Sequence, residues 1–361
     1  MTPTTIPDLQ PAREGVIRCS AWLAGQHLML LNGDCRTVLK ELADESVQCV
    51  VTSPPYWGLR DYDTSGQIGL EATPEQYVIE LVEVFREVRR VMAGTGTLWL
   101  NLGDSYTSGD RATWRSGASQ NKGQDVQNDM PRPKTPPGLK RKDMVGIPWR
   151  VAFALQEDGW YLRQDIIWAK PNPMPESVTD RCTKSHEYIF LLTKCEQYFY
   201  NHEAIKEPSE SDHDSGNGFE GRQGGAKHMP MSGGAGTKQP WLHRNSNSPR
   251  VTGNLPGRDD NGRACNGPGQ EYRNKRSVWR VGTQPYSEAH FATFPPDLIK
   301  PCVLAGTKPG DVILDPFGGS GTTGMVAIEL GRKAILIELN AEYAKLCAQR
   351  CAITPGFPLA C

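Results

Sequence analysis

Residues 312–323, with the sequence VILDPFGGSGTT, decide the fold class that we predict for this chain. A short apolar strand ends in Asp315, and a loop almost without side chains follows before the next helix. A ligand can approach such a backbone closely because glycine leaves the peptide groups uncovered. The stretch lacks the lysine of a GxxxxGK[ST] phosphate loop, so it does not indicate a nucleoside triphosphate site.

The next predicted strand ends in a second acid, Glu338, within KAILIELN at 333–340. A carboxylate at the end of a neighbouring strand can accept hydrogen bonds from both hydroxyls of a ribose. Together, the glycine-rich loop and this acid predict a nucleoside pocket. The alternative is an ordinary tight turn beside a surface acid.

Residues 52–57, TSPPYW, follow another buried strand, predicted at 47–51. The amino group of an aromatic base is a poor nucleophile because its lone pair is delocalised. The Ser53 hydroxyl and the Pro54 carbonyl would accept its hydrogens and favour a tetrahedral nitrogen, while Tyr56 offers a face for stacking. The motif predicts methyl transfer to an amino group; a plain proline turn is the alternative.

Around these motifs, apolar runs of strand length alternate with helical patterns, such as TPEQYVIELVEVFREVRRVMAGTG with Thr73 as a cap, Pro74 in the first turn and a glycine end. This alternation predicts an α/β fold with a mostly parallel, doubly wound sheet. The runs HEYIFLLTK and QYFYN are expected to pair as a hairpin. From about 205 to 277 the periodicity disappears, and such a long irregular stretch indicates a functional or disordered insert.

The two motifs and their order resemble the bacterial and phage DNA amino-methyltransferases of the N6-adenine and N4-cytosine type. TSPPYW resembles the family's catalytic tetrapeptide, DPFGGSGTT its cofactor loop, and HFATFPPDL at 290–298 the segment that closes over the cofactor. A catalytic motif that precedes the cofactor motif is the permuted order of the beta class. The resemblance implies the Rossmann-like methyltransferase fold, with a seven-stranded sheet whose last strand is antiparallel.

The resemblance also implies S-adenosyl-L-methionine as the cofactor and gives roles to individual residues. The catalytic residues implied are Ser53, Pro54, Pro55 and Tyr56. The cofactor residues implied are Asp34 near its adenine, Glu338 on its ribose, and Thr293, Phe294, Asp315, Phe317, Gly319, Ser320, Gly321 and Thr322. No covalent enzyme intermediate and no metal are expected.

Double-stranded DNA is the implied partner, with the target nucleotide flipped out of the duplex into the pocket. The residues expected to contact DNA are Trp57, Arg60, Lys140, Arg141, Lys142, Lys170, His243, Arg244 and Asn245. Two of these have a plainer interpretation: Arg60 pairs with Asp61, and Lys170 is an ordinary exposed lysine.

Four segments follow from these assignments. Residues 1–16 form a flexible tail, and 17–205 form the catalytic half of the methyltransferase domain, with a DNA-contacting loop at about 107–145. Residues 206–276 form a target-recognition insert. Residues 277–361 form the cofactor-binding half.

The sequence constrains the target base least. Serine at the first motif position, here Ser53, goes with N4-cytosine enzymes in this family and aspartate with N6-adenine enzymes, although the rule is loose. The longer stretches TSPPYWGLRDYD and WAKPNPMPESVTDRCTKSHEYIFLLTK resemble solitary chromosomal and prophage methylases, which usually have no cognate nuclease and are usually regarded as adenine methylases. Adenine N6 is therefore favoured, with cytosine N4 as the alternative. An RNA or protein methyltransferase and a catalytically silent DNA-binding regulator stay open as other classes.

The composition bounds the remaining possibilities. A net charge of −1 argues against non-specific coating of nucleic acid. The chain has no apolar run of about 18 residues and no basic-apolar secretory start, which favours a cytoplasmic protein without a membrane span. Its ten cysteines include no CxxC pair, so neither a zinc site nor a disulfide framework is indicated, and Cys347 and Cys351 are expected to serve packing. A homodimer is expected by analogy with the beta class.

Overall fold

The computed structural model describes residues 17–19, 27–59, 61–62, 64–107, 135–209, 272–284 and 294–352. The tail at 1–16, most of the insert, and the predicted site residues Arg60, His243, Arg244, Asn245 and Thr293 lie outside these ranges. The chain divides into two compact units, one of Met1–Ile205 with Lys275–Cys361 and one of Lys206–Asn274. In the second unit, β7 (Glu207–Pro208) pairs antiparallel with β8 (Tyr272–Arg273).

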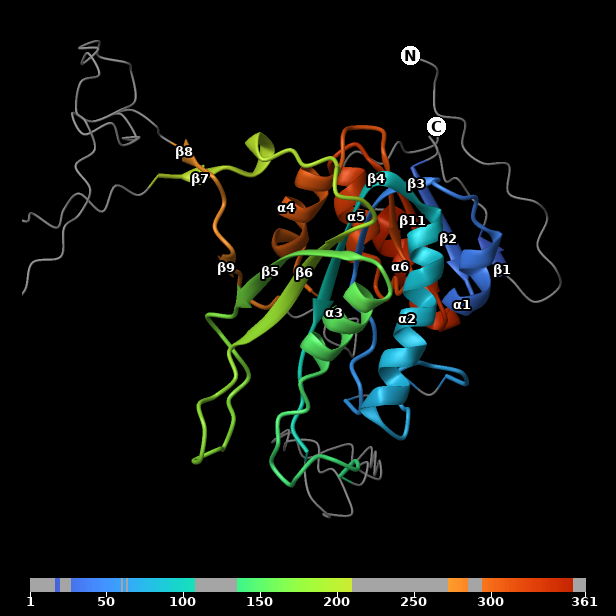
Figure 1. The fold of residues 1–361 in the computed structure, drawn as a ribbon. Coiled ribbons are helices and arrows are strands. Elements are labelled where there is room, and N and C mark those ends of the chain that lie inside the picture. The colour runs from blue at the N-terminus through green and yellow to red at the C-terminus, as the bar shows by residue number, and fades with distance from the viewer. Residues whose placement is uncertain are drawn as a thin grey trace, which may run out of the picture. The chain divides into compact units, whose positions relative to one another are not determined.

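One twisted sheet forms the centre of the first unit (Figure 1). Its strands lie side by side in the order β1 (Ile17–Cys19), β2 (Leu28–Asn32), β11 (Lys333–Glu338), β10 (Val312–Asp315), β3 (Val47–Thr52), β4 (Met92–Leu102), β6 (His186–Thr193), β5 (Tyr161–Ala169) and β9 (Val278–Arg280). The seven strands from β2 to β5 are the expected methyltransferase sheet, and β1 and β9 extend it at the two edges. Among these seven, β6 alone runs antiparallel to its neighbours, so one antiparallel strand is present as expected, and it lies between β4 and β5.

Helices cover both faces of the sheet (Figure 1). One face packs against α1 (Cys35–Val38) with its 3-10 turn (Leu39–Glu41), α2 (Pro74–Val91) and α3 (Ile147–Glu157). The other face packs against α4 (Pro296–Gly306), α5 (Thr322–Glu329) and α6 (Ala341–Ala352). Successive strand residues point to opposite faces, so Leu98 and Leu100 of β4 join the first core while Trp99 joins the second.

The ends of α2 follow from its sequence. The Thr73 hydroxyl accepts a hydrogen bond from the Gln76 amide, and Pro74 occupies the first turn, where its missing N–H costs nothing. The helix ends at Val91 and enters β4 directly at Met92. The predicted glycine end is therefore wrong, because the segment MAGTG belongs to the strand.

The predicted hairpin of HEYIFLLTK with QYFYN is also wrong. The first run is β6, which pairs with β4 and with β5, so both of its edges are already hydrogen-bonded. The second run lies outside the strands, and its Phe199 and Asn201 amides donate to the carbonyls of Thr95 and Ala305. The hairpin that exists is β5 with β6.

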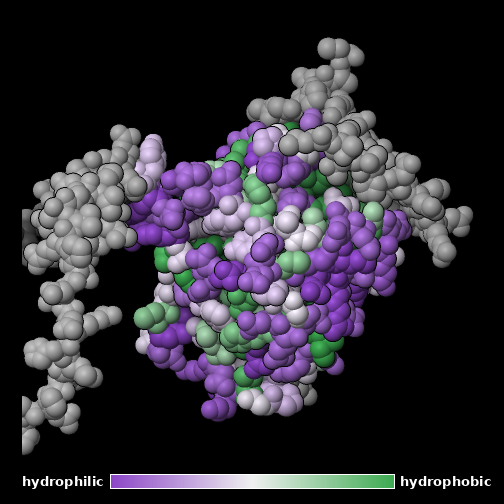
Figure 2. Space-filling model, turned by 45° about the horizontal axis from the view of Figure 1, so that its top comes forward, coloured by the Kyte–Doolittle hydropathy of each residue, from purple (hydrophilic) through white to green (hydrophobic). Residues whose placement is uncertain are grey.

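The exterior fits a globular protein. Figure 2 shows a mostly hydrophilic face on which apolar side chains form small patches. Among the described residues, no helix is long and apolar enough to span a bilayer, and no cluster of ligand side chains is suited to a metal. Cys347 and Cys351 are free and buried, so their predicted packing role is confirmed.

Candidate active site

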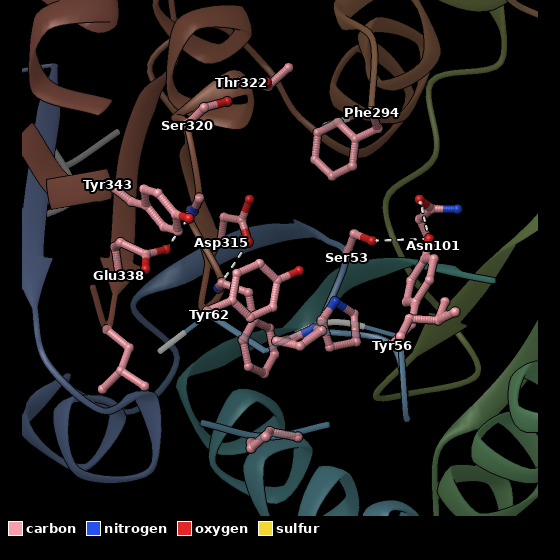
Figure 3. Close-up of a pocket in the computed structure, with 18 of the residues that line it drawn as sticks. Ser53, Tyr56, Tyr62, Asn101, Phe294, Asp315, Ser320, Thr322, Glu338 and Tyr343 are labelled. Atoms are coloured by element: carbon pink, nitrogen blue, oxygen red, sulfur yellow. Dashed lines mark hydrogen bonds between the residues drawn. The ribbon is translucent and has the colours of Figure 1, made fainter. Parts of the chain in front are cut away.

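A pocket of about 900 Å³ lies at the carboxyl ends of the parallel strands β2, β3, β10 and β11. Ligands bind at this edge in open α/β sheets because the loops that follow the strands converge there. The pocket receives Asp34 from the loop after β2, Ser53 from the loop after β3, the glycine-rich loop after β10, and Glu338 from the end of β11 (Figure 3). The two motifs that are far apart in sequence therefore line one cavity.

Asp315 ties the catalytic loop to the cofactor loop. Its side chain is buried and accepts hydrogen bonds from the hydroxyls of Thr52 and Thr323, both at 2.7 Å, and from the Phe317 amide at 3.1 Å. Burial raises the pKa of Asp315 to about 6, although these hydrogen bonds oppose the shift. Thr52 directly precedes Ser53, so the carboxyl group sets the spacing between the two motifs.

The glycine-rich loop is shaped by close packing. Gly321 has φ +80°, and a Cβ there would lie 2.6 Å from Cys347 Sγ. The side chains of Ser320 and Thr322 accept hydrogen bonds from Arg350 of α6, at 2.8 and 2.9 Å. This anchoring role of Arg350 was absent from the sequence-based predictions, since an arginine in the last turn of a helix carries no distinctive signal.

Glu338 fits the ribose of a nucleoside. Its two oxygens accept the amides of Gly319 at 2.7 Å and Asn340 at 2.8 Å, and each keeps a lone pair for a further donor. Burial raises the pKa of Glu338 to about 7. The aromatic rings of Tyr62 and Tyr343 meet edge to face nearby, and both residues line the pocket although sequence reasoning missed them.

Further predicted cofactor residues line the pocket, whereas Gly321 lies outside its lining. Phe294 and Phe317 line the same cavity, and Phe294 faces it from the loop before α4 (Figure 3). Asp34 caps α1 and is held by Arg36, whose side chain donates to the Asp34 carboxylate, and this pairing lowers the pKa of Asp34 against the effect of burial. The pocket therefore suits the nucleoside portion of S-adenosyl-L-methionine. It offers a carboxylate that can accept both ribose hydroxyls, aromatic walls and the open backbone of the glycine-rich loop.

A chain of hydrogen bonds occupies the catalytic end of the pocket. The Ser53 hydroxyl donates to Tyr56 Oη at 3.3 Å. Tyr56 Oη donates to Glu187 Oε2 at 2.8 Å, and Asn101 Oδ1 is an alternative acceptor 3.2 Å from Tyr56 Oη. Lys170 forms an ion pair with the other oxygen of Glu187. Burial is the largest cause that raises the pKa of Tyr56, so this phenol stays protonated as a donor.

Neighbouring elements hold this catalytic loop in place. The Tyr77 hydroxyl of α2 donates to the Pro55 carbonyl at 2.8 Å. Gly103 leaves room for the Tyr56 ring, because a Cβ at Gly103 would lie 2.5 Å from it. Sequence reasoning missed Asn101 and Glu187, although Asn101 is a usable signal because it is the one polar residue in the run LWLNL at the end of β4, whereas Glu187 stands beside His186 at the start of β6.

The predicted DNA contacts that lie within the described residues divide into three groups. Trp57 requires correction: its side chain is only 5% exposed, and its indole N–H donates to the Glu71 carbonyl within the core under the pocket, so it faces no duplex. Lys170 lies in the pocket wall, where it pairs with Glu187 and covers the Trp168 ring, so it is not an exposed lysine. The third group, Lys140, Arg141 and Lys142, is exposed on one loop, with Lys142 paired to Asp180.

Comparison with known proteins places the chain in a family. A model of the N6/N4 methyltransferase family, described as DNA methylase, matches residues 47–349. The chain belongs to this family. It is therefore a DNA amino-methyltransferase, and S-adenosyl-L-methionine is its cofactor. The RNA and protein methyltransferase alternatives lose their support.

Several curated relatives are similar over most of their length. The chain is 46% identical over 321 residues to the type II methyltransferase M.SmaI of Serratia marcescens, with 89% of each chain covered. It is 47% identical over 323 residues to M.XycI of Xanthomonas campestris pv. cyanopsidis, covering 89% of this chain and 86% of the relative.

Solved structures share the fold of this methylase. The PvuII DNA methyltransferase, named as cytosine-N4-specific, has a TM-score of 0.56 at 17% identity, covering 90% of this chain and 86% of that chain. A putative DNA modification methylase from Thermus thermophilus, complexed with S-adenosyl-L-methionine, has a TM-score of 0.51 at 24% identity, with 92% and 97% covered.

Proposed function

We propose that this methylase transfers the methyl group of S-adenosyl-L-methionine to the N4 amino group of a cytosine that has left the DNA helix and entered the pocket. The observation that carries the proposal is the direction of the hydrogen-bond chain from Ser53 through Tyr56 to Glu187. Flipping is required because the amino group of a paired, stacked base is inaccessible to a recessed pocket.

The direction of this hydrogen-bond chain follows from which of its groups carry a proton to donate. The Tyr56 hydroxyl has one proton, and the carboxylate oxygen of Glu187 at 2.8 Å can only accept it. The Tyr56 oxygen then accepts the proton of Ser53. Ser53 lines the pocket, and no donor within the described residues is bonded to its oxygen, so its lone pairs can accept a hydrogen of the target amino group.

An acceptor at Ser53 supports the chemistry of transfer. It holds the amino group so that the nitrogen lone pair turns away from conjugation with the ring and toward the methyl group. The cofactor supplies a methyl group on a positively charged sulfur. The nitrogen would form its new bond to the methyl carbon as the bond from that carbon to sulfur breaks, with the electron pair staying on sulfur, and the proton lost from the nitrogen would pass to solvent water.

The choice of cytosine reverses the sequence-based preference for adenine, which came from the resemblance of two longer stretches to adenine methylases. It rests on the serine at the first motif position, whose neutral hydroxyl is tied to Tyr56. The solved structure named cytosine-N4-specific points the same way, although at 17% identity its likeness concerns the fold. Adenine N6 is the alternative product.

The test is nucleoside analysis of DNA after incubation with the purified protein and S-adenosyl-L-methionine. Mass spectrometry should find N4-methylcytosine, and Ser53→Ala should reduce its rate of formation by about 100-fold. N6-methyladenine would overturn the choice of base while keeping the amino-methyltransferase. Cofactor binding without any methylated nucleoside would instead identify a silent DNA-binding regulator.

A further inference from the structure

Met174 is an exposed apolar side chain at the rim of the pocket. It is 84% exposed, more than any other large apolar side chain in the described part of the chain. It also lines the pocket, a property that among those exposed apolar side chains it shares only with Leu59, which is 41% exposed. An isolated exposed apolar residue needs no explanation in general, but this one stands where the substrate must enter.

The segment that carries Met174 is braced. Pro173 and Pro175 flank it and fix the backbone φ on both sides. Farther along, the Arg181 side chain forms an ion pair with Glu176 at 2.6 Å. The same guanidinium lies 4.0 Å from the centre of the Tyr106 ring. The side chain is therefore presented to solvent by a supported loop, which Figure 1 shows projecting past the sheet between β5 and β6.

The start of this loop is tied to the base pocket. Lys170, four positions before Met174, forms the ion pair with Glu187, and Glu187 accepts the Tyr56 hydroxyl. On the other side, the Asn172 side chain accepts the Thr283 amide at 3.0 Å. The distance between Met174 and the catalytic loop is thereby held by these contacts.

We infer that Met174 enters the DNA base stack and fills the space that the target nucleotide leaves when it flips. This inference rests on the proposed flipping of the base. A methionine suits the role because its unbranched, polarisable side chain packs well against aromatic rings, and apolar side chains of this kind separate base steps in proteins that kink DNA. The partner is thus the double helix at the target pair itself.

The experiment uses the full-length protein and a duplex in which pyrrolocytosine, a cytosine analogue that pairs with guanine and fluoresces more strongly when unstacked, replaces the target cytosine. Binding of the unaltered protein should raise the fluorescence. Met174→Ala should lower that rise and slow single-turnover methylation of a normal duplex by about tenfold, which corresponds to about 1.4 kcal/mol of barrier. Its affinity for S-adenosyl-L-methionine should not change.

The methylation rate on a duplex with a mismatch at the target base pair distinguishes a role in base flipping from a merely structural role of Met174. Mismatching lowers the cost of flipping, so it should restore the rate of Met174→Ala to within about twofold of the unaltered protein. The matched control is Ile79→Ala, since Ile79 is 59% exposed on α2 and lies outside the pocket lining. This control should behave as the unaltered protein does.

Two results would overturn the role of Met174. One is an equal fluorescence rise and rate for Met174→Ala on the normal duplex; the other is a slow rate that the mismatch does not restore. Failure of the proposed function looks different, because the unaltered protein itself would then raise no fluorescence and transfer no methyl group to either duplex.

Discussion

The ribose contact predicted for Glu338 should make cofactor binding sensitive to pH. Burial raises its pKa to about 7, and the ionised form is the one that accepts both ribose hydroxyls. Affinity for S-adenosyl-L-methionine should therefore fall below pH 7, by up to about tenfold per pH unit for one required deprotonation. Titration calorimetry between pH 6 and 8.5 would measure it. Glu338→Gln should bind weakly at every pH and lose the pH dependence, whereas equal affinities of the unaltered protein at pH 6 and 8 would contradict the role.

The same burial affects the stability of the cofactor-free protein. The pKa of Glu338 and the pKa of Asp315 are raised above their ordinary values of 4.5 and 3.8, to about 7 and about 6. The folded state therefore keeps these protons at a pH where the unfolded state has lost them, and this contribution to stability is lost as the pH rises from about 4 to 7. Asp315→Asn and Glu338→Gln should flatten this part of the curve of unfolding free energy against pH.

Tyr56 and Glu187 should act as one unit in catalysis. Tyr56→Phe keeps the ring but removes the hydroxyl that orients Ser53, and Glu187→Gln removes the carboxylate that orients the hydroxyl. Each should lower the single-turnover rate by about tenfold, and the double variant should be no slower than the slower single one. Rate losses that multiply in the double variant would show that the two side chains act separately.

At the scale of single residues, sequence reasoning found the side chains that sit inside recognisable motifs, such as Ser53 and Glu338. It missed Glu187, which reaches Tyr56 from 131 positions away, because only the antiparallel placement of β6 brings them together. It misassigned Trp57 because a motif does not reveal which aromatic side chain turns inward.

The turn between β10 and α5 depends on glycine for two separate reasons. Gly321→Ala would place a Cβ 2.6 Å from Cys347 Sγ in addition to the strain of φ +80°. The expected loss of unfolding free energy is about 3 kcal/mol by denaturant titration. Gly310→Ala is the matched control, since it has φ +86° with nothing within 4 Å and should lose only about 1 kcal/mol. Equal losses in the two variants would show that helix packing does not constrain the loop.

Local signals explain which elements were predicted well. Helix α2 carries its own cap, first-turn proline and apolar spacing, so its start is encoded within a few residues. The pairing of β6 with β4 is not local, because α3 and β5 lie between them in the chain. The pairing of β6 with β5 is a hairpin, for which the aromatic run after β6 was a plausible competitor. Helix α1 is short, because it passes into a 3-10 turn at Leu39–Glu41.

The two-unit organisation allows the recognition role of the insert to be tested. Since β7 pairs with β8, the two ends of the segment between them are adjacent, and a two-residue Asn-Gly turn can replace residues 209–271. The shortened protein should bind S-adenosyl-L-methionine within about twofold of the full chain and lose at least about 100-fold of its methylation at the recognised motif, as each lost base contact contributes about 1–3 kcal/mol. Undiminished methylation of the same motif would place recognition elsewhere.

For the whole molecule, the most direct measurement is long-read sequencing with base-modification detection, on DNA from a methylase-free host that expresses the protein. A parallel culture expressing Ser53→Ala serves as the control. We predict N4-methylcytosine in one short motif, present with the unaltered protein and absent with the variant. A stably produced protein that leaves no modified motif in the host DNA, or a Ser53→Ala culture modified to the same extent, would contradict the account.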